Sequence, residues 1–170
     1  EMTVRFRAFD NGIGLRYELG PQPALEGDIA IVEELTQFAV GEKTTTWYTP
    51  ADGFNRNEYI YRMAPAGEVE TAHTPTTFKN PDGIYMAIHE AALVDYSAMS
   101  LLALRPGNFE ARLRNWSGGP KVKTKAPFTS PWRTIQIAPD AVGLINSDII
   151  LNLNEPNALG DVSYAKPGKY

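Results

Sequence analysis

The stretch that decides the fold is Thr3-Val4-Arg5-Phe6-Arg7-Ala8-Phe9-Asp10-Asn11-Gly12-Ile13-Gly14-Leu15-Arg16-Tyr17-Glu18-Leu19. Its first half alternates apolar residues with Arg5 and Arg7, and this period of two predicts a strand. Residues 13–19 are also rich in β-favouring residues, and the Asn-Gly pair between the halves is a strong signal for a hairpin turn. We therefore expect an antiparallel hairpin whose arginines face solvent or a neighbouring sheet.

Working outward, turn signals recur along the rest of the chain. They are Arg105-Pro106-Gly107-Asn108, Ser117-Gly118-Gly119-Pro120 and Ala138-Pro139-Asp140. The segments around them predict strands at 68–72, 109–115, 122–125, 132–137 and 147–153. This spacing is typical of an antiparallel sandwich or barrel, so the fold class is mainly β. Two segments, 29–40 and 84–104, fit a helix or a strand equally well.

The totals limit the classes of protein. The 170 residues suit one domain, with 43% apolar and 21% charged residues as in ordinary globular chains. A net charge of −4 argues against nucleic acid as a partner. The absence of cysteine excludes disulfides and thiolate chemistry, and no apolar run reaches the roughly 18 residues that span a membrane. Strand patterning ends at 153, so we expect a domain at 1–153 and a linker at 154–170. The ends resemble cuts, which predicts a fragment.

Glu90 is the residue that stands out chemically. It lies in the otherwise apolar string Met86-Ala87-Ile88-His89-Glu90-Ala91-Ala92-Leu93, where a carboxylate is costly to bury unless it is paired or bound to a metal. One interpretation is a strand with an exposed polar face. The other is a carboxylate directed out of the domain toward a hard cation such as calcium. The pair His89-Glu90 lacks the second histidine of a zinc motif.

Five strings, taken in order, carry a resemblance to a known family. They are Arg5-Phe6-Arg7-Ala8-Phe9-Asp10-Asn11-Gly12-Ile13-Gly14-Leu15-Arg16-Tyr17, Ile88-His89-Glu90-Ala91-Ala92-Leu93-Val94-Asp95-Tyr96, Pro131-Trp132-Arg133-Thr134-Ile135, Leu151-Asn152-Leu153-Asn154-Glu155-Pro156 and Lys166-Pro167-Gly168-Lys169-Tyr170. Together they resemble the N-terminal domain of glycoside hydrolase family 97, whose members are α-glucosidases and α-galactosidases.

The resemblance implies a β-supersandwich similar to the galactose mutarotase fold, packed on a catalytic (β/α)8 barrel. It implies that the barrel carries the catalytic carboxylates and acts on α-linked oligosaccharides, so this chain has no catalytic residue of its own. It also implies an active-site calcium held by glutamates, one of them from the N-terminal domain, and Glu90 is the residue at that place. Residues 84–93 are then a strand. A periplasmic location is implied as well.

Two departures from the family pattern matter. The family's domain normally has a long further segment before the first string, so sheet partners of this chain should be missing or supplied by another segment. The barrel is missing too, which predicts that this chain alone hydrolyses nothing. A barrel-facing apolar patch is expected, with Trp132 and residues 154–170 as candidates, although core packing explains Trp132 equally well.

Two other functions remain open. A stand-alone carbohydrate-binding module would stack sugars on loop aromatics, and loop packing is the simpler account of those residues. They are Trp47, Tyr48, Phe54, Tyr59 and Tyr61. A mutarotase-like enzyme acting alone would need an acid and a base in one cleft, supplied by His73, His89 or glutamates.

Overall fold

The computed structural model describes residues 1–53, 56–115, 118–166 and 168. Its strands are β1 (Met2–Phe9), β2 (Gly12–Leu19), β3 (Asp28–Ile31), β4 (Gln37–Ala39), β5 (Thr45–Tyr48), β6 (Arg62–Pro65), β7 (Thr71–His73), β8 (Thr76–Lys79), β9 (Tyr85–Ala91), β10 (Met99–Arg105), β11 (Asn108–Leu113), β12 (Val122–Lys125), β13 (Phe128–Thr129) and β14 (Trp132–Ala138). Two short α-helices follow, α1 (Ala141–Ile145) and α2 (Ile149–Leu153). The chain is therefore mainly β, as predicted. Among the described residues, no helix has the length and apolar character needed to cross a membrane.

The hairpin predicted at the start of the chain forms as expected. β1 pairs with β2 in antiparallel register from Met2 opposite Leu19 to Phe9 opposite Gly12. The hairpin begins an eight-stranded sheet with the order β1-β2-β14-β9-β8-β5-β6, in which β13 also pairs with β2. β14 lies at the centre of this sheet, since it joins the hairpin to β9.

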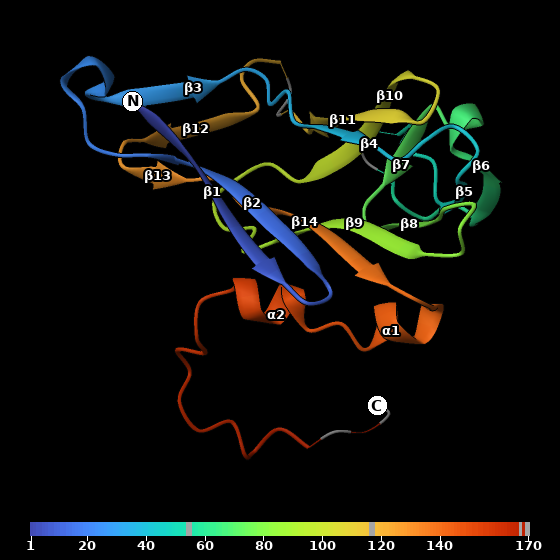
Figure 1. Cartoon of the computed structure of the whole chain (residues 1–170). Helices are drawn as coiled ribbons and strands as arrows, with labels where there is room; N and C mark the ends of the chain where they lie inside the picture. The colour runs from blue at the N-terminus through green and yellow to red at the C-terminus, as the bar shows by residue number, and fades with distance from the viewer. Residues whose placement is uncertain (54–55, 116–117, 167, 169–170) are drawn as a thin grey trace.

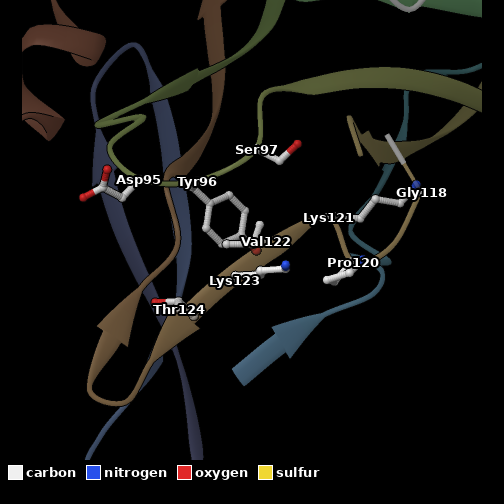
Figure 2. A pocket seen from close by; sticks show the side chains of 9 residues that line it. All are labelled: Asp95, Tyr96, Ser97, Gly118, Pro120, Lys121, Val122, Lys123 and Thr124. Atoms are coloured by element: carbon white, nitrogen blue, oxygen red, sulfur yellow. The ribbon is translucent and has the colours of Figure 1, made fainter. Parts of the chain in front are cut away.

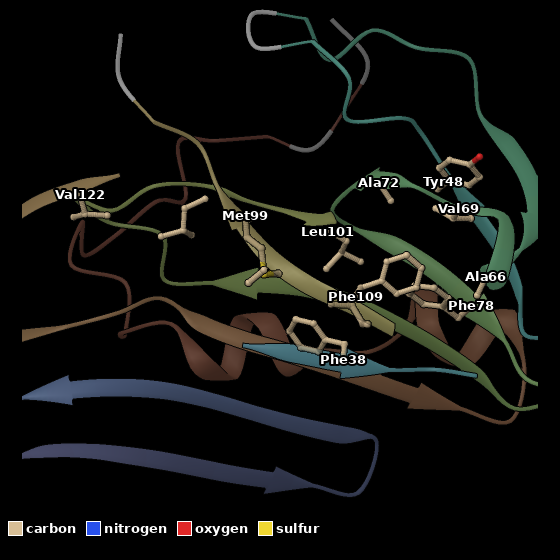
Figure 3. Packing of buried hydrophobic residues seen from close by; sticks show 13 residues of the cluster. Phe38, Tyr48, Ala66, Val69, Ala72, Phe78, Met99, Leu101, Phe109 and Val122 are labelled. Atoms are coloured by element: carbon tan, nitrogen blue, oxygen red, sulfur yellow. The ribbon is translucent and has the colours of Figure 1, made fainter. Parts of the chain in front are cut away.

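A second layer covers part of the large sheet. It consists of a four-stranded sheet in the order β4-β11-β10-β7 and the separate ribbon β12-β3 (Figure 1). The core lies between the layers, where Phe78 of the large sheet meets Phe109 of the small one with ring centroids 5.9 Å apart. Figure 3 shows these two rings beside Leu101, Met99 and Phe38. The architecture is an antiparallel sandwich.

The two segments that the sequence left open are strands separated by irregular backbone. Residues 29–40 contain β3 and β4, and residues 84–104 contain β9 and most of β10. These residues form strands rather than helices because their backbone is hydrogen-bonded to strands from other parts of the chain. β9, for example, is hydrogen-bonded to β14 on one side and to β8 on the other.

The strand predicted at 147–153 is wrong, because residues 149–153 form α2. Its two fully buried residues, Ile149 and Leu153, are four apart, which places both on one face of a helix. They pack on β2 where Gly12 and Gly14 carry no side chain. In the sequence, the run Ile149-Ile150-Leu151 is apolar throughout and shows no period by itself.

The second layer does not reach β1. Met2, Val4 and Phe6 are on the inner face of the large sheet, as their register through β2 to β14 indicates, yet all three are exposed. On the opposite face, Arg5 is paired with Glu18, and Arg7 donates to the carbonyl of Asn152 in α2. The arginines thus point away from the sandwich interior.

Candidate functional site

Glu90 lies on the inner face of the large sheet, inside the sandwich. It is on β9 directly opposite Arg133 of β14, and 8% of its surface is exposed. The backbone N–H of Met99 donates to both of its oxygens, at 3.1 and 3.2 Å. Nη1 of Arg133 donates to Oε2 at 2.6 Å. The carboxylate is therefore held by donors of the domain itself.

Arg133 carries a second carboxylate on its other side. Its Nε donates to Oε1 of Glu34 at 2.7 Å and its Nη2 to Oε2 at 2.6 Å, which is the two-pronged geometry that binds carboxylates best. The guanidinium has no exposed surface, and Glu34 is buried as well. One arginine thus joins β9 and β14 to residues 32–36, the irregular segment between β3 and β4. We call Glu34, Arg133 and Glu90 the charge triad.

Hydroxyl groups surround the Glu34 side of the charge triad. Thr36 donates to Oε1 of Glu34 at 2.9 Å, and the Tyr17 hydroxyl lies 2.7 Å from that of Thr36. Tyr96, from the loop between β9 and β10, donates to Oε2 of Glu34 at 3.4 Å, and its ring lies 5.8 Å from the Arg133 guanidinium carbon. Every charged atom of the triad therefore has polar partners, as burial requires.

The protonation equilibria reflect this burial. Burial raises the pKa of Glu90 above its ordinary value, against the opposing effect of the Arg133 guanidinium. Burial by itself would lower the pKa of Arg133, but the hydrogen bonds and charge of Glu34, together with Glu90, raise it. Burial and the neighbouring Glu34 also raise the pKa of the Tyr96 hydroxyl. Arg133 donates one hydrogen bond to Glu90 and two to Glu34, so the guanidinium binds Glu90 through fewer contacts.

The geometry of Glu90 does not fit a calcium ion as it stands. Calcium takes about six to eight oxygen ligands. Both oxygens of Glu90 instead face N–H donors, one of them on a cation 2.6 Å away. Within the described part of the chain, no three His, Cys, Asp or Glu side chains are grouped to hold a metal. The role of Glu90 toward calcium stays a prediction, and it requires the carboxylate to leave Arg133.

A surface pocket of about 570 Å³ lies beside the charge triad. Its lining comes from Asp95, Tyr96, Ser97, Gly118 and residues 120–124, and Figure 2 shows the Tyr96 ring over Val122. Tyr96 connects the pocket to the charge triad, because it lines the pocket and its hydroxyl donates to Glu34. The pocket offers polar groups for a hydroxylated ligand, but its lining contains no histidine and a single carboxylate.

Trp132 is a core residue. It is buried on the outer face of the large sheet with Ile149 and Leu153 of α2, and the guanidinium carbon of Arg16 lies 4.4 Å from its ring centroid. Its side chain is covered by residues of this chain, so core packing is the correct account. Residues 154–166 contain no helix or strand and are exposed throughout.

The remaining sequence candidates are not brought together. His73 is on β7 of the small sheet. His89 is on β9 of the large one and alternates with the inward-facing Glu90, so it lies on the outer face, away from the small sheet. Burial lowers the pKa of both. Of the loop aromatics, Tyr48 belongs to the core and Trp47 stacks on Tyr85. Phe54 lies outside the described residues.

Sequence reasoning missed Glu34 and Arg133. The signal for Arg133 was available, because it is a charged residue in the apolar strand string Trp132-Arg133-Thr134-Ile135 and its charge is opposite to that of Glu90. Glu34 gave no such signal, because it lies between the charged Glu33 and the apolar Leu35, and a glutamate in such a mixed segment is usually exposed. Its pairing with Arg133 spans 99 positions of the chain.

Comparison with known proteins agrees with this architecture. The family model described as glycosyl-hydrolase 97 N-terminal matches residues 1–156. The chain belongs to glycoside hydrolase family 97. It corresponds to the N-terminal domain of these enzymes, and this confirms the resemblance carried by the five sequence strings.

Solved structures of family 97 enzymes resemble this chain over a part of their own length. It is similar to an enzyme from Pseudoalteromonas sp. strain K8 seen in complex with acarbose, with 56% identity and a TM-score of 0.92, covering 98% of this chain and 25% of that one. The same figures hold for the E480Q form of that enzyme in complex with panose. A β-arabinopyranosidase is more distant, with 25% identity and a TM-score of 0.69 over 82% of this chain. The family 97 chain thus spans about a quarter of the length of these relatives.

Proposed function

We propose that this family 97 domain serves an enzyme that cleaves α-glucosidic or α-galactosidic bonds and that it packs on the catalytic (β/α)8 barrel of the same polypeptide. The observation that carries the proposal is the family match over residues 1–156, together with relatives four times as long. Panose is built from α-linked glucose units, and its complex with a relative supports the α-glucosidic alternative. A periplasmic location is part of the proposal and rests on the family resemblance.

The domain itself is proposed to be non-catalytic. Glycoside hydrolysis commonly uses a pair of carboxyl groups that flank the scissile bond. The buried pair in the described residues, Glu34 and Glu90, is bound to Arg133 from both sides. Neither carboxylate is free to donate a proton to a sugar oxygen. No observation favours the alternative of a stand-alone carbohydrate-binding module.

Activity measurements test this proposal. We expect the full-length enzyme to release glucose from panose and to hydrolyse a p-nitrophenyl α-glucoside or α-galactoside, while the 170-residue chain at equal concentration releases no product above the buffer rate. Turnover by the chain alone would contradict its non-catalytic role. A full-length enzyme that hydrolyses neither glycoside would contradict the proposed substrates.

Calcium binding by Glu90 has its own test. We expect calorimetry to detect calcium binding to the full-length enzyme and not to the chain alone, and Glu90→Gln to weaken binding by about tenfold or more. Glu34→Gln is the matched control, because it also removes a carboxylate from Arg133 without touching the predicted ligand. Equal weakening by both variants would show that the effect comes from the charge triad and not from coordination.

A further inference from the structure

The two helices α1 and α2 form a thin layer on the outer face of the large sheet (Figure 1). Each has five residues, too few for a helix to be stable by itself, so packing must hold them. The inner side of α2 supplies that packing. Ile149 and Leu153 fill the space above Gly12 and Gly14, where an added Cβ would lie 2.7 Å from a methyl carbon of each helix residue.

The outer side of the same layer is also apolar. Ile145 is 82% exposed and Leu151 is 75% exposed, and Val142 is exposed beside them in sequence. Residues 141–153 contain one charged side chain, Asp148, whereas about a quarter of residues in ordinary chains are charged. A layer that is apolar on both sides fits a position between two bodies better than a position against water.

The rest of the polypeptide is the occupant that fits this layer. The chain spans a quarter of the length of its relatives, so such an enzyme has a large further part that is linked to the domain. Residues 154–166 run along the far side of α1 and α2 in Figure 1. Any domain that follows in sequence is therefore tethered next to this layer. Leu159 and Tyr164 add exposed apolar groups to the tether.

We propose that the outer face of α1 and α2, centred on Ile145 and Leu151, is the surface on which the catalytic domain docks. This rests on the proposed function, because it takes the catalytic domain as the partner. Docking there buries the apolar residues that the isolated domain exposes. It also places the catalytic domain on the outer face of the large sheet, whereas Glu90 lies on the inner face, so this docking surface and the predicted calcium role of Glu90 are alternatives that the two sets of experiments separate.

Hydroxyl-radical footprinting of the full-length enzyme tests the surface with matched residues. Ile145 and Ile60 are 82% and 88% exposed in the domain, and Leu151 and Leu35 are 75% and 68% exposed. Docking predicts that Ile145 is modified about tenfold more slowly than Ile60, and Leu151 more slowly than Leu35, because the core of an interface excludes water. Equal modification of the two isoleucines, whether both are reactive or both are protected, would overturn the proposal.

A variant pair gives an independent readout. Chymotrypsin cuts after exposed aromatic residues such as Tyr164, and a new lysine creates no site for it. Ile145→Lys is expected to speed cleavage of the full-length enzyme at 159–165 by about tenfold, since a charge opposes burial in the interface, and Ile60→Lys is expected to leave it unchanged. Equal rates in both variants would overturn the docking surface.

The two proposals fail separately. An enzyme that is active on α-glucosides yet modified freely at Ile145 refutes the docking surface alone. An enzyme that protects Ile145 but hydrolyses neither α-glycoside refutes the proposed substrates alone. Protection of Ile145 that disappears on dilution would indicate contact between two copies of the enzyme and would also overturn the docking assignment.

Discussion

Replacing Arg133 with methionine is expected to lower the free energy of unfolding of this chain by about 3–5 kcal/mol. The guanidinium is the shared partner of Glu34 and Glu90, and its removal leaves two carboxylates buried without a counter-charge. Attraction within a buried pair adds little net stability, but an uncompensated buried charge costs much more. Urea unfolding followed by tryptophan fluorescence measures the loss.

Two further variants identify the cause. Arg133→Lys keeps the charge and loses the two-pronged bond to Glu34, so an intermediate loss is expected. Combining Arg133→Met with Glu34→Gln and Glu90→Gln removes the buried charges together and should recover part of the stability lost in Arg133→Met alone. A loss below about 1 kcal/mol in Arg133→Met would show that the triad does not hold the sandwich together.

Gly12→Ala is expected to be nearly as damaging, with a loss of about 3 kcal/mol or more. Gly12 has a φ of +149°, and a Cβ there would lie 2.2 Å from the carbonyl oxygen of Ile135 and 2.7 Å from Cδ1 of Ile149. The oxygen belongs to the backbone of β14 and cannot move without separating β2 from β14. The variant therefore strains the hairpin, the central strand and α2 at once. The same urea unfolding experiment measures it.

Substitutions at two other glycines distinguish the backbone strain in Gly12→Ala from its steric clash. Gly27 has a φ of +90° and open space around its Cβ position, so Gly27→Ala reports conformational strain without a clash, about 1 kcal/mol. Gly20 has open space and no positive φ, so Gly20→Ala should change stability by less than about 1 kcal/mol. A loss in Gly12→Ala no larger than in Gly27→Ala would contradict the close packing of β2 on β14.

The fold class and several strands could be predicted from the sequence because strand signals are local. The alternation around Arg5 and Arg7 and the following Asn-Gly turn specify the β1–β2 hairpin without reference to the rest of the chain. The strings at 109–115, 122–125 and 132–137 gave β11, β12 and β14 for the same reason. Segment 84–104 needed the family resemblance, since its propensities favour a helix and its pairing with β14 and β8 is long-range.

The candidate site was predictable in part. Glu90 could be singled out because a carboxylate within an apolar string needs a partner. The identity of that partner depends on the pairing of β9 with β14, which places Arg133 opposite Glu90, and on the return of residues 32–36 to the same place. Both contacts join residues that are far apart in the sequence, so the residues next to Glu90 or Glu34 do not indicate them.

By itself, then, the sequence determined a mainly β chain, its first hairpin, several of its later strands and its family, because each depends on nearby residues or on ordered strings. The tertiary structure decided that residues 149–153 form a helix, because the gap above Gly12 and Gly14 accepts two side chains four positions apart. It also decided that Glu90 faces Arg133 inside the sandwich, because burying a charge is favourable only when distant parts of the chain supply its partners.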